Sequence, residues 1–125
     1  MLDLEALDRV DSKSMYKIYD KWAEISKNAY NSNIKIAQFK DVDHVVFVGM
    51  GGSGTLGDIF SSILSKTNIH ISIVKGYLLP KTIDKNSLVI FTSVSGNTAE
   101  TLSAIKDAVK QNYNTISFSS GGLLE

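Results

Sequence analysis

Residues 45–54 read VVFVGMGGSG, and this stretch decides the fold class of the chain. It opens with four consecutive apolar residues, three of them β-branched valines around a phenylalanine. Such a run is typical of a strand that is buried on both faces of a parallel sheet. The glycines end the strand abruptly, and an amphipathic pattern follows them. The stretch therefore predicts a strand, a tight turn and a helix.

The same succession continues through the rest of the chain. Short apolar runs predict further strands at residues 69–74, 88–91 and 115–118. Apolar residues at helical spacing predict two helices between them, and these residues are Leu56, Ile59, Phe60, Ile63 and Leu64 in one helix and Leu102, Ile105, Ala108 and Val109 in the other. Alternating strands and helices indicate an α/β fold with a doubly wound parallel sheet. We expect four strands in the order 2-1-3-4, although residues 76–86 show no helix for the crossover that parallel strands require.

The first forty residues predict a helical segment. Ser12 is a suitable N-cap, and apolar residues then recur at three- and four-residue steps, at Met15, Ile18, Trp22, Ile25 and Ala29. Ile34 and Ile36 resume the pattern. We expect residues 1–40 to pack on a domain formed by residues 41–125. Because the chain stops soon after the fourth predicted strand, we expect this domain to be truncated.

The composition excludes several classes of protein. The chain has 125 residues, enough for about one domain with a core of its own, and 13 basic residues balance 13 acidic ones. This balance argues against nucleic acid or an anionic membrane as the main partner. The absence of cysteine leaves no disulfide framework, and we expect a cytoplasmic protein.

The glycine-rich turn, residues 49–54, satisfies the G-x-G-x-x-G pattern of dinucleotide-binding folds. That motif requires an acidic residue at the end of the second strand, where this chain has Val74, Lys75 and Gly76. The P-loop motif also fails, because Gly54 is followed by Thr55 without a lysine. We therefore expect no nucleotide cofactor. The turn either presents backbone N–H groups to another anion or is a tight turn without a ligand.

The turn after the third predicted strand reads SVSGNTAE, residues 93–100. Hydroxyl groups and backbone N–H groups are neutral donors that suit a phosphate. The alternative is simple helix capping by Asn97 and Glu100. Capping does not require three hydroxyl side chains together, so the turn favours a phosphate site.

Strand order brings these turns together. In the order 2-1-3-4 the first and third strands are neighbours at the switch point, and their turns open onto one crevice. Residues 119–122, SSGG, follow the fourth strand and line the same edge. The three turns together predict a ligand-binding edge.

The three motifs, residues 49–58, 93–102 and 119–122, resemble the SIS (sugar isomerase) domain. More narrowly, they resemble the N-terminal half of archaeal-type bifunctional phosphoglucose/phosphomannose isomerases, over residues 41–122. The resemblance implies interconversion of glucose 6-phosphate or mannose 6-phosphate with fructose 6-phosphate, through an enediolate and without a metal or other cofactor. It also implies a homodimer.

Carried over motif by motif, the resemblance assigns two groups of site residues. Ser93, Ser95 and Thr98 hold the phosphate, and Gly52 and Ser53 contact the sugar.

Residues for the acid–base chemistry are not evident in this chain. His44 and His70 lie at the edge of the sheet opposite the binding turns, Glu100 suits a cap, and Asp58 suits a partner within the fold. The resemblance places the catalytic glutamate and histidine in a second SIS half.

We therefore predict a phosphosugar-binding part of an isomerase that is inactive alone. The alternative is a free-standing SIS module that senses phosphosugars, and a dehydrogenase fragment is disfavoured.

Overall fold

The computed structural model describes residues 3–33 and 37–124. The chain divides into two compact units, Met1–Ala37 and Gln38–Glu125, and each is described by itself.

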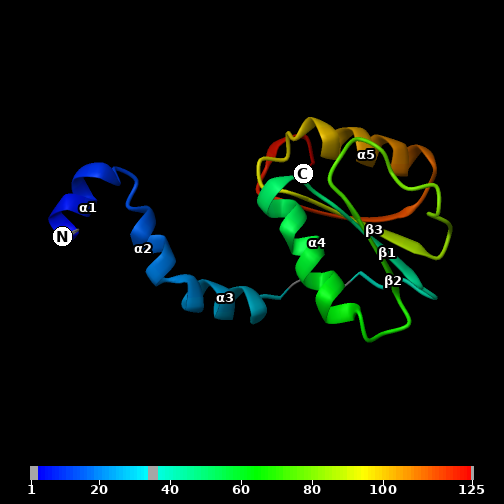
Figure 1. Ribbon diagram of the computed structural model, residues 1–125, viewed down its shortest axis with the longest axis horizontal. Coiled ribbons are helices and arrows are strands. Elements are labelled where there is room, and N and C mark those ends of the chain that lie inside the picture. The colour runs from blue at the N-terminus through cyan, green and yellow to red at the C-terminus, as the bar shows by residue number, and fades with distance from the viewer. Residues whose placement is uncertain (1–2, 34–36, 125) are drawn as a thin grey trace. The chain divides into compact units, whose positions relative to one another are not determined.

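The second unit is an α/β domain built on four parallel strands (Figure 1). Its elements are β1 (His44–Val48), α4 (Gly51–Leu64), β2 (His70–Val74), β3 (Ser87–Ser93), α5 (Ala99–Lys110), β4 (Asn114–Ser119) and the short 3₁₀ helix η1 (Gly122–Leu124). The strand order is β2-β1-β3-β4, which confirms the predicted sheet.

One face of the sheet packs against α5 and holds the main core. Val46, Val48, Val89 and Phe91 are buried there against small side chains of α5. The helix buries Thr101, Ala104 and Ala108. Val109, which helical spacing groups with Leu102, Ile105 and Ala108, lies outside the buried face, because it is 61% exposed. The small residues lie on the buried side of the helix and let it approach the strands closely.

The opposite face carries α4. The rings of Phe47 on β1 and Phe60 on α4 stack with centroids 5.2 Å apart. Helix α4 contacts chiefly β1 and β2. Beside it lies an open groove of about 580 Å³, lined by Val45, Phe47, Leu56, Phe60, Leu64, Ile90, Thr92 and Phe118.

The connection from β2 to β3 crosses the sheet without a helix, as its sequence indicated. Ile83 from this connection is buried in the core on the α5 face, and Leu79 packs against that core. The chain thus moves from β1 to β2 over one face and returns to β3 over the other. This alternation keeps both crossovers in the hand that parallel strands prefer.

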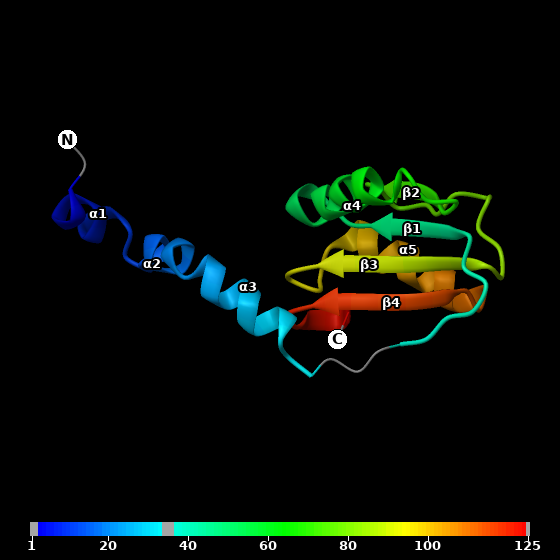
Figure 2. The ribbon, with the colours of Figure 1, turned by 90° about the horizontal axis from the view of Figure 1, so that it is seen from below.

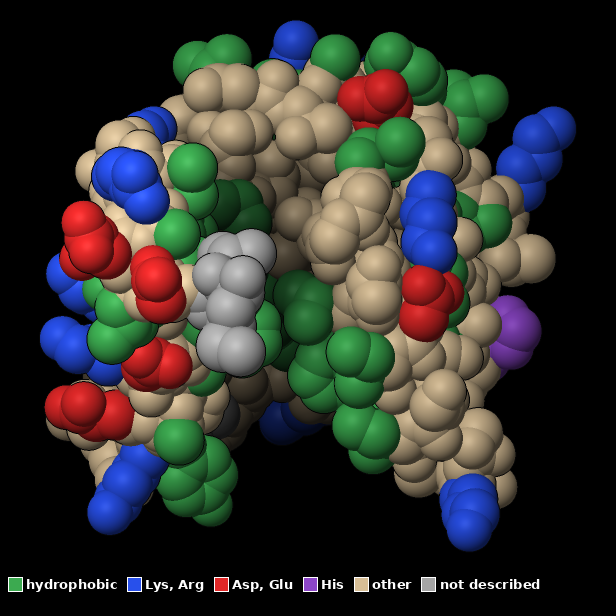
Figure 3. Space-filling view, turned by 60° about the vertical axis from the view of Figure 1, so that its left-hand side comes forward, with side chains coloured by type: hydrophobic (Ala, Val, Ile, Leu, Met, Phe, Trp, Pro, Cys, Tyr) green, Lys and Arg blue, Asp and Glu red, His purple; other side chains and the backbone are tan. Residues whose placement is uncertain are grey.

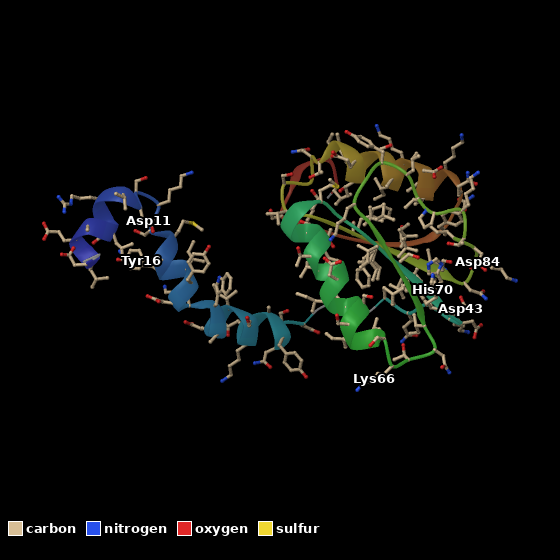
Figure 4. All side chains as sticks on the ribbon, viewed as in Figure 1. Asp11, Tyr16, Asp43, Lys66, His70 and Asp84 are labelled. Carbon is tan, nitrogen blue, oxygen red and sulfur yellow. The ribbon has the colours of Figure 1, made fainter. Side chains whose placement is uncertain are left out.

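The first unit is helical, as predicted, with elements α1 (Leu4–Val10), α2 (Met15–Asp20) and α3 (Trp22–Tyr30). The prediction of an N-cap at Ser12 was wrong. Asp3 caps α1 by accepting the Ala6 N–H at 2.8 Å. Before α2, Asp11 accepts the Tyr16 N–H at 3.0 Å (Figure 4).

The Asp11 carboxylate is stabilised by hydrogen bonds from backbone N–H groups, chiefly that of Met15 and next that of Tyr16. These bonds hold the pKa of Asp11 below its ordinary value. Asp11 therefore takes the capping role that the sequence pattern assigned to its neighbour. Ile34 and Ile36 lie outside the described residues. The packing of this segment on the domain stays a prediction.

The surface of the described residues carries both charged and hydrophobic side chains. On the face seen in Figure 3, acidic and basic side chains are interspersed, and hydrophobic side chains are exposed among them. Within residues 3–33 and 37–124, no helix combines the length and the apolar character needed to cross a bilayer.

Candidate functional site

The turns that follow β1, β3 and β4 meet at one edge of the sheet. All strands are parallel, so their carboxyl ends lie at the same edge of the sheet (Figure 2). Val48, the last residue of β1, pairs with Phe91, and β3 continues beyond it to Ser93, which pairs with Ser119 at the end of β4. The contact between the first two turns is close, because a Cβ atom on Gly49 would lie 3.0 Å from the Thr92 carbonyl oxygen. The second and third turns are hydrogen-bonded, with the Ser120 N–H donating to the Val94 carbonyl at 3.2 Å. The topology thus produces the predicted convergence of three turns.

The first turn is shorter than the glycine-rich motif suggested. Helix α4 begins at Gly51, so only Gly49 and Met50 separate it from β1. Gly52 is exposed and Ser53 is half-buried in the first turn of the helix. Met50 occupies the N-cap position, and no side chain caps the helix there. The N–H groups of the first turn of α4 therefore lie at the edge where the three turns meet.

The glycines of this turn serve two different purposes. A Cβ atom on Gly54 would lie 2.6 Å from the Gly49 carbonyl oxygen, so Gly54 permits the close approach of α4 to β1. A Cβ atom on Gly52 would meet no atom within 4 Å. Packing in a tight turn without a ligand therefore accounts for a glycine at position 54. It gives no reason for a glycine at position 52.

The second turn brings two of the predicted phosphate-binding hydroxyls into contact. Ser93, buried at the end of β3, lies with its Oγ 3.0 Å from the Thr98 Oγ1. Ser95 is exposed on the same turn, and its Oγ accepts the Asn97 N–H at 3.3 Å. The buried Ser93 orients the Thr98 hydroxyl, and Ser95 and Thr98 are more accessible to a ligand.

The capping interpretation of this turn was wrong. Helix α5 begins at Ala99 with Thr98 in the N-cap position, and no side chain makes a capping hydrogen bond. The Asn97 Oδ1 instead accepts the Leu123 N–H at 3.2 Å, and Glu100 lies in the first turn of α5. Two helices, α4 and α5, thus begin at this edge without side-chain caps. Uncapped N-termini favour an anion, through their N–H groups and the positive end of the helix dipole.

The third turn packs on the second. Gly122 has a φ of +81°, and a Cβ atom there would lie 2.9 Å from the Asn97 amide group. The Ser119 Oγ accepts the Gly121 N–H at 3.1 Å. The Ser119 hydroxyl thus bonds within the third turn, whereas the Ser120 hydroxyl donates to the Val94 carbonyl of the second turn.

Lys75, which the sequence places at the end of the second strand, also lies at this edge. It directly follows β2, and its Nζ lies 2.7 Å from the Asp58 Oδ2 on α4. Its side chain also covers Gly54, at 3.1 Å from the position of a Cβ atom. The ion pair shows that Asp58 is a partner within the fold, as expected.

The two histidines lie far from this edge along the strands. His44 and His70 are the first residues of β1 and β2, at the amino ends of those strands. The structure therefore does not bring them to the three turns, as the sequence predicted.

The apolar groove on the α4 face does not suit a phosphate. Its lining is almost entirely hydrocarbon, with the hydroxyl of Thr92 as the one polar side chain among the residues around it. A phosphate placed there would lose its hydration without gaining hydrogen bonds, which is strongly unfavourable. The carboxyl edge is the better candidate site.

Comparison with known proteins identifies the family. Residues 38–122 match the SIS domain. The chain belongs to the SIS domain family. It is 40% identical over 103 residues to a bifunctional phosphoglucose/phosphomannose isomerase of Caldicellulosiruptor bescii. The aligned region covers 82% of this chain and 29% of that protein.

Two further likenesses extend this result. A D-glucosamine-6-phosphate 4-epimerase of Sulfolobus acidocaldarius is 30% identical over 112 residues, covering 89% of this chain and 35% of that protein. The crystal structure of a proposed phosphosugar isomerase of Bacillus subtilis matches with a TM-score of 0.56 and 31% identity, covering 66% of this chain and 27% of that one.

This SIS domain thus spans about a third or less of the length of the relatives that it matches. The predicted family and fold are confirmed. The roles of Ser93, Ser95, Thr98, Gly52 and Ser53 stay predictions.

Proposed function

We propose that this SIS domain binds the phosphosugar substrate of a glucose-6-phosphate/mannose-6-phosphate isomerase. The observation that carries the proposal is the meeting of three turns at the carboxyl edge, where α4 and α5 begin without side-chain caps. The isomerase of Caldicellulosiruptor bescii supports the reaction, and the epimerase of Sulfolobus acidocaldarius is named for another hexose 6-phosphate. The 6-phosphate is the group that these substrates have in common.

In this proposal the second turn holds the phosphate. The Thr98 hydroxyl, oriented by Ser93, and the Ser95 hydroxyl donate to phosphate oxygens, together with N–H groups of the first turn of α5. A hydrogen bond to a charged group contributes about 1.5–3 kcal/mol. Gly52 and Ser53 face the sugar, because the space beside Gly52 is open. The domain then serves as the floor of a substrate site.

The proton transfers between C1 and C2 require an acid and a base that we place outside this chain. His44 and His70 are at the amino edge, and the Asp58 carboxylate is ion-paired with Lys75. We propose that the whole protein, as a cytoplasmic homodimer, completes the site for glucose 6-phosphate, mannose 6-phosphate and fructose 6-phosphate. Substantial glucose 6-phosphate isomerisation by the isolated 125-residue chain would contradict this division.

The phosphate site is tested by removing its hydroxyls one at a time. We expect Ser95→Ala and Thr98→Val each to weaken fructose 6-phosphate binding about tenfold, which corresponds to about 1.4 kcal/mol, the loss of one hydrogen bond to the phosphate. Isothermal titration calorimetry measures the change, and urea unfolding checks that stability falls by no more than about 1 kcal/mol.

Ser62→Ala is the matched control. Its exposed hydroxyl donates to the Asp58 carbonyl on α4, away from the turns, so binding should be unchanged. Titration with NADP tests the disfavoured dehydrogenase function. Stabilisation by NADP and not by fructose 6-phosphate would overturn the proposal, as would unchanged sugar binding in both site variants.

A further inference from the structure

The amino edge of the sheet holds a hydrogen-bonded cluster that the proposed function does not use. His44, 6% exposed at the start of β1, lies between the two neighbouring strands. Its Nε2 is 2.9 Å from the Ser72 Oγ on β2, and its Nδ1 is 3.3 Å from the Ser87 Oγ on β3. One imidazole ring at the start of β1 thus connects the start of β3 with the middle of β2.

The surrounding hydrogen bonds indicate which nitrogen of this ring carries the proton. The Ser87 hydroxyl donates to the Asp84 carboxylate at 3.0 Å, so it has no proton left for His44. Nδ1 of His44 therefore donates to Ser87, which leaves Nε2 as the acceptor of the neutral ring, facing the Ser72 hydroxyl. A second proton would enter at Nε2. The Ser72 hydroxyl, which also lies 3.4 Å from the His70 Nε2, would then have to turn from donor to acceptor.

The charged groups around His44 come from three parts of the domain. Burial lowers the pKa of His44 below its ordinary value, and so does the nearby ring of His70, with centroids 4.7 Å apart. Asp84, Asp43 and a backbone hydrogen bond with Thr82 oppose this shift with smaller effects. His70, Asp43 and Asp84 lie together at this end of the sheet (Figure 4).

We propose that His44 is an acid-sensitive clasp, which holds the start of β1 to β2 and β3 when neutral and loosens this junction when protonated. Protonation places a charge in a buried position beside a second imidazole and reverses the hydrogen bond with Ser72. Both changes act at the same junction of the three strands. The clasp is independent of what the carboxyl edge binds.

The direction of the pH effect follows from the lowered pKa. As the pH falls, the unfolded chain binds a proton at this histidine before the folded chain does. The contribution of His44 to stability is therefore complete above about pH 6.5, the ordinary value of a histidine. It is lost progressively as the pH falls from there through the lower value of the folded state.

Two measurements test the clasp. The chain contains two histidines, so proton NMR can follow each imidazole separately. We expect the His44 resonance of the folded protein to titrate below about pH 6.5. Urea unfolding at about pH 7.5 and about pH 5.5 should show the folded-to-unfolded ratio of the wild type falling about threefold to tenfold more than that of His44→Gln.

His70→Gln is the control for the neighbouring charge. It keeps the hydrogen bonds of His44 to Ser72 and Ser87, so part of the acid sensitivity should remain, reduced by the loss of repulsion. A His44 resonance that titrates at or above the ordinary value would overturn the proposal. So would equal losses of stability on acidification in the wild type and His44→Gln. The NMR titration needs only the wild type, so it stands if His44→Gln fails to fold.

Discussion

Replacing Gly96 with alanine is expected to destabilise the domain by about 3 kcal/mol or more. Gly96 has a φ of +64°, a left-handed conformation that costs an alanine about 1–2 kcal/mol. The added methyl group would also lie within contact distance of the Gly121 carbonyl oxygen and 2.7 Å from the Ser119 Oγ. The third turn would have to move away from the second. Urea unfolding measures the loss, and fructose 6-phosphate binding should fall below detection.

Gly76→Ala is the matched control for this substitution. A Cβ atom on Gly76 would meet no atom within 4 Å, and its φ is not in the left-handed region. Its stability should change by no more than about 0.5 kcal/mol. If Gly96→Ala were as stable as this control, the close packing of the second and third turns would be contradicted.

The fold could be predicted because its strands are short apolar runs. Residues 45–48 and 88–91 are each recognisable by themselves, and the alternation with helices then fixes a parallel sheet. Val109 shows where this reasoning fails. Helical spacing placed it with Leu102, Ile105 and Ala108. Ala108 is buried and Leu102 and Ile105 pack against the core, but Val109 is exposed, and Ala104 is buried although the pattern did not include it. Which apolar stripe is buried depends on the space beside the strands, and a local pattern does not contain that information.

The edge that carries the site could be predicted for the same reason, since strand order alone brings the turns together. The contacts within it could not. Asn97 has the sequence signature of an N-cap, but its side chain accepts a hydrogen bond from Leu123, 26 residues later. Likewise, His44 and Ser87 are 43 residues apart and meet only because β1 and β3 are paired. Such partners follow from tertiary structure, so a local motif could identify the residues without their roles.

Gly52 and Gly54 of α4 also belong to one sequence motif, and the motif does not tell their roles apart. Two substitutions separate these roles. Gly54→Ala should destabilise the domain by about 2 kcal/mol, even though alanine favours a helix by about 1 kcal/mol. Its methyl group would lie 2.6 Å from the Gly49 carbonyl oxygen and force α4 away from β1. Gly52→Ala meets no atom within 4 Å and gains the same helix propensity, so its stability should stay equal or rise by up to about 1 kcal/mol.

At Gly52 the substitution should lower ligand affinity and leave stability unharmed, whereas at Gly54 it should lower stability. The methyl group of Gly52→Ala would occupy the open space that we assign to the sugar, so fructose 6-phosphate affinity should fall at least about tenfold, or about 1.4 kcal/mol, in calorimetry. A stable Gly52→Ala domain with unchanged affinity would exclude Gly52 from the sugar site. A stable Gly54→Ala domain would show that α4 has room to move. Loss of binding without loss of stability at Gly52 is expected only if this glycine serves the ligand, because packing gives no reason for a glycine there.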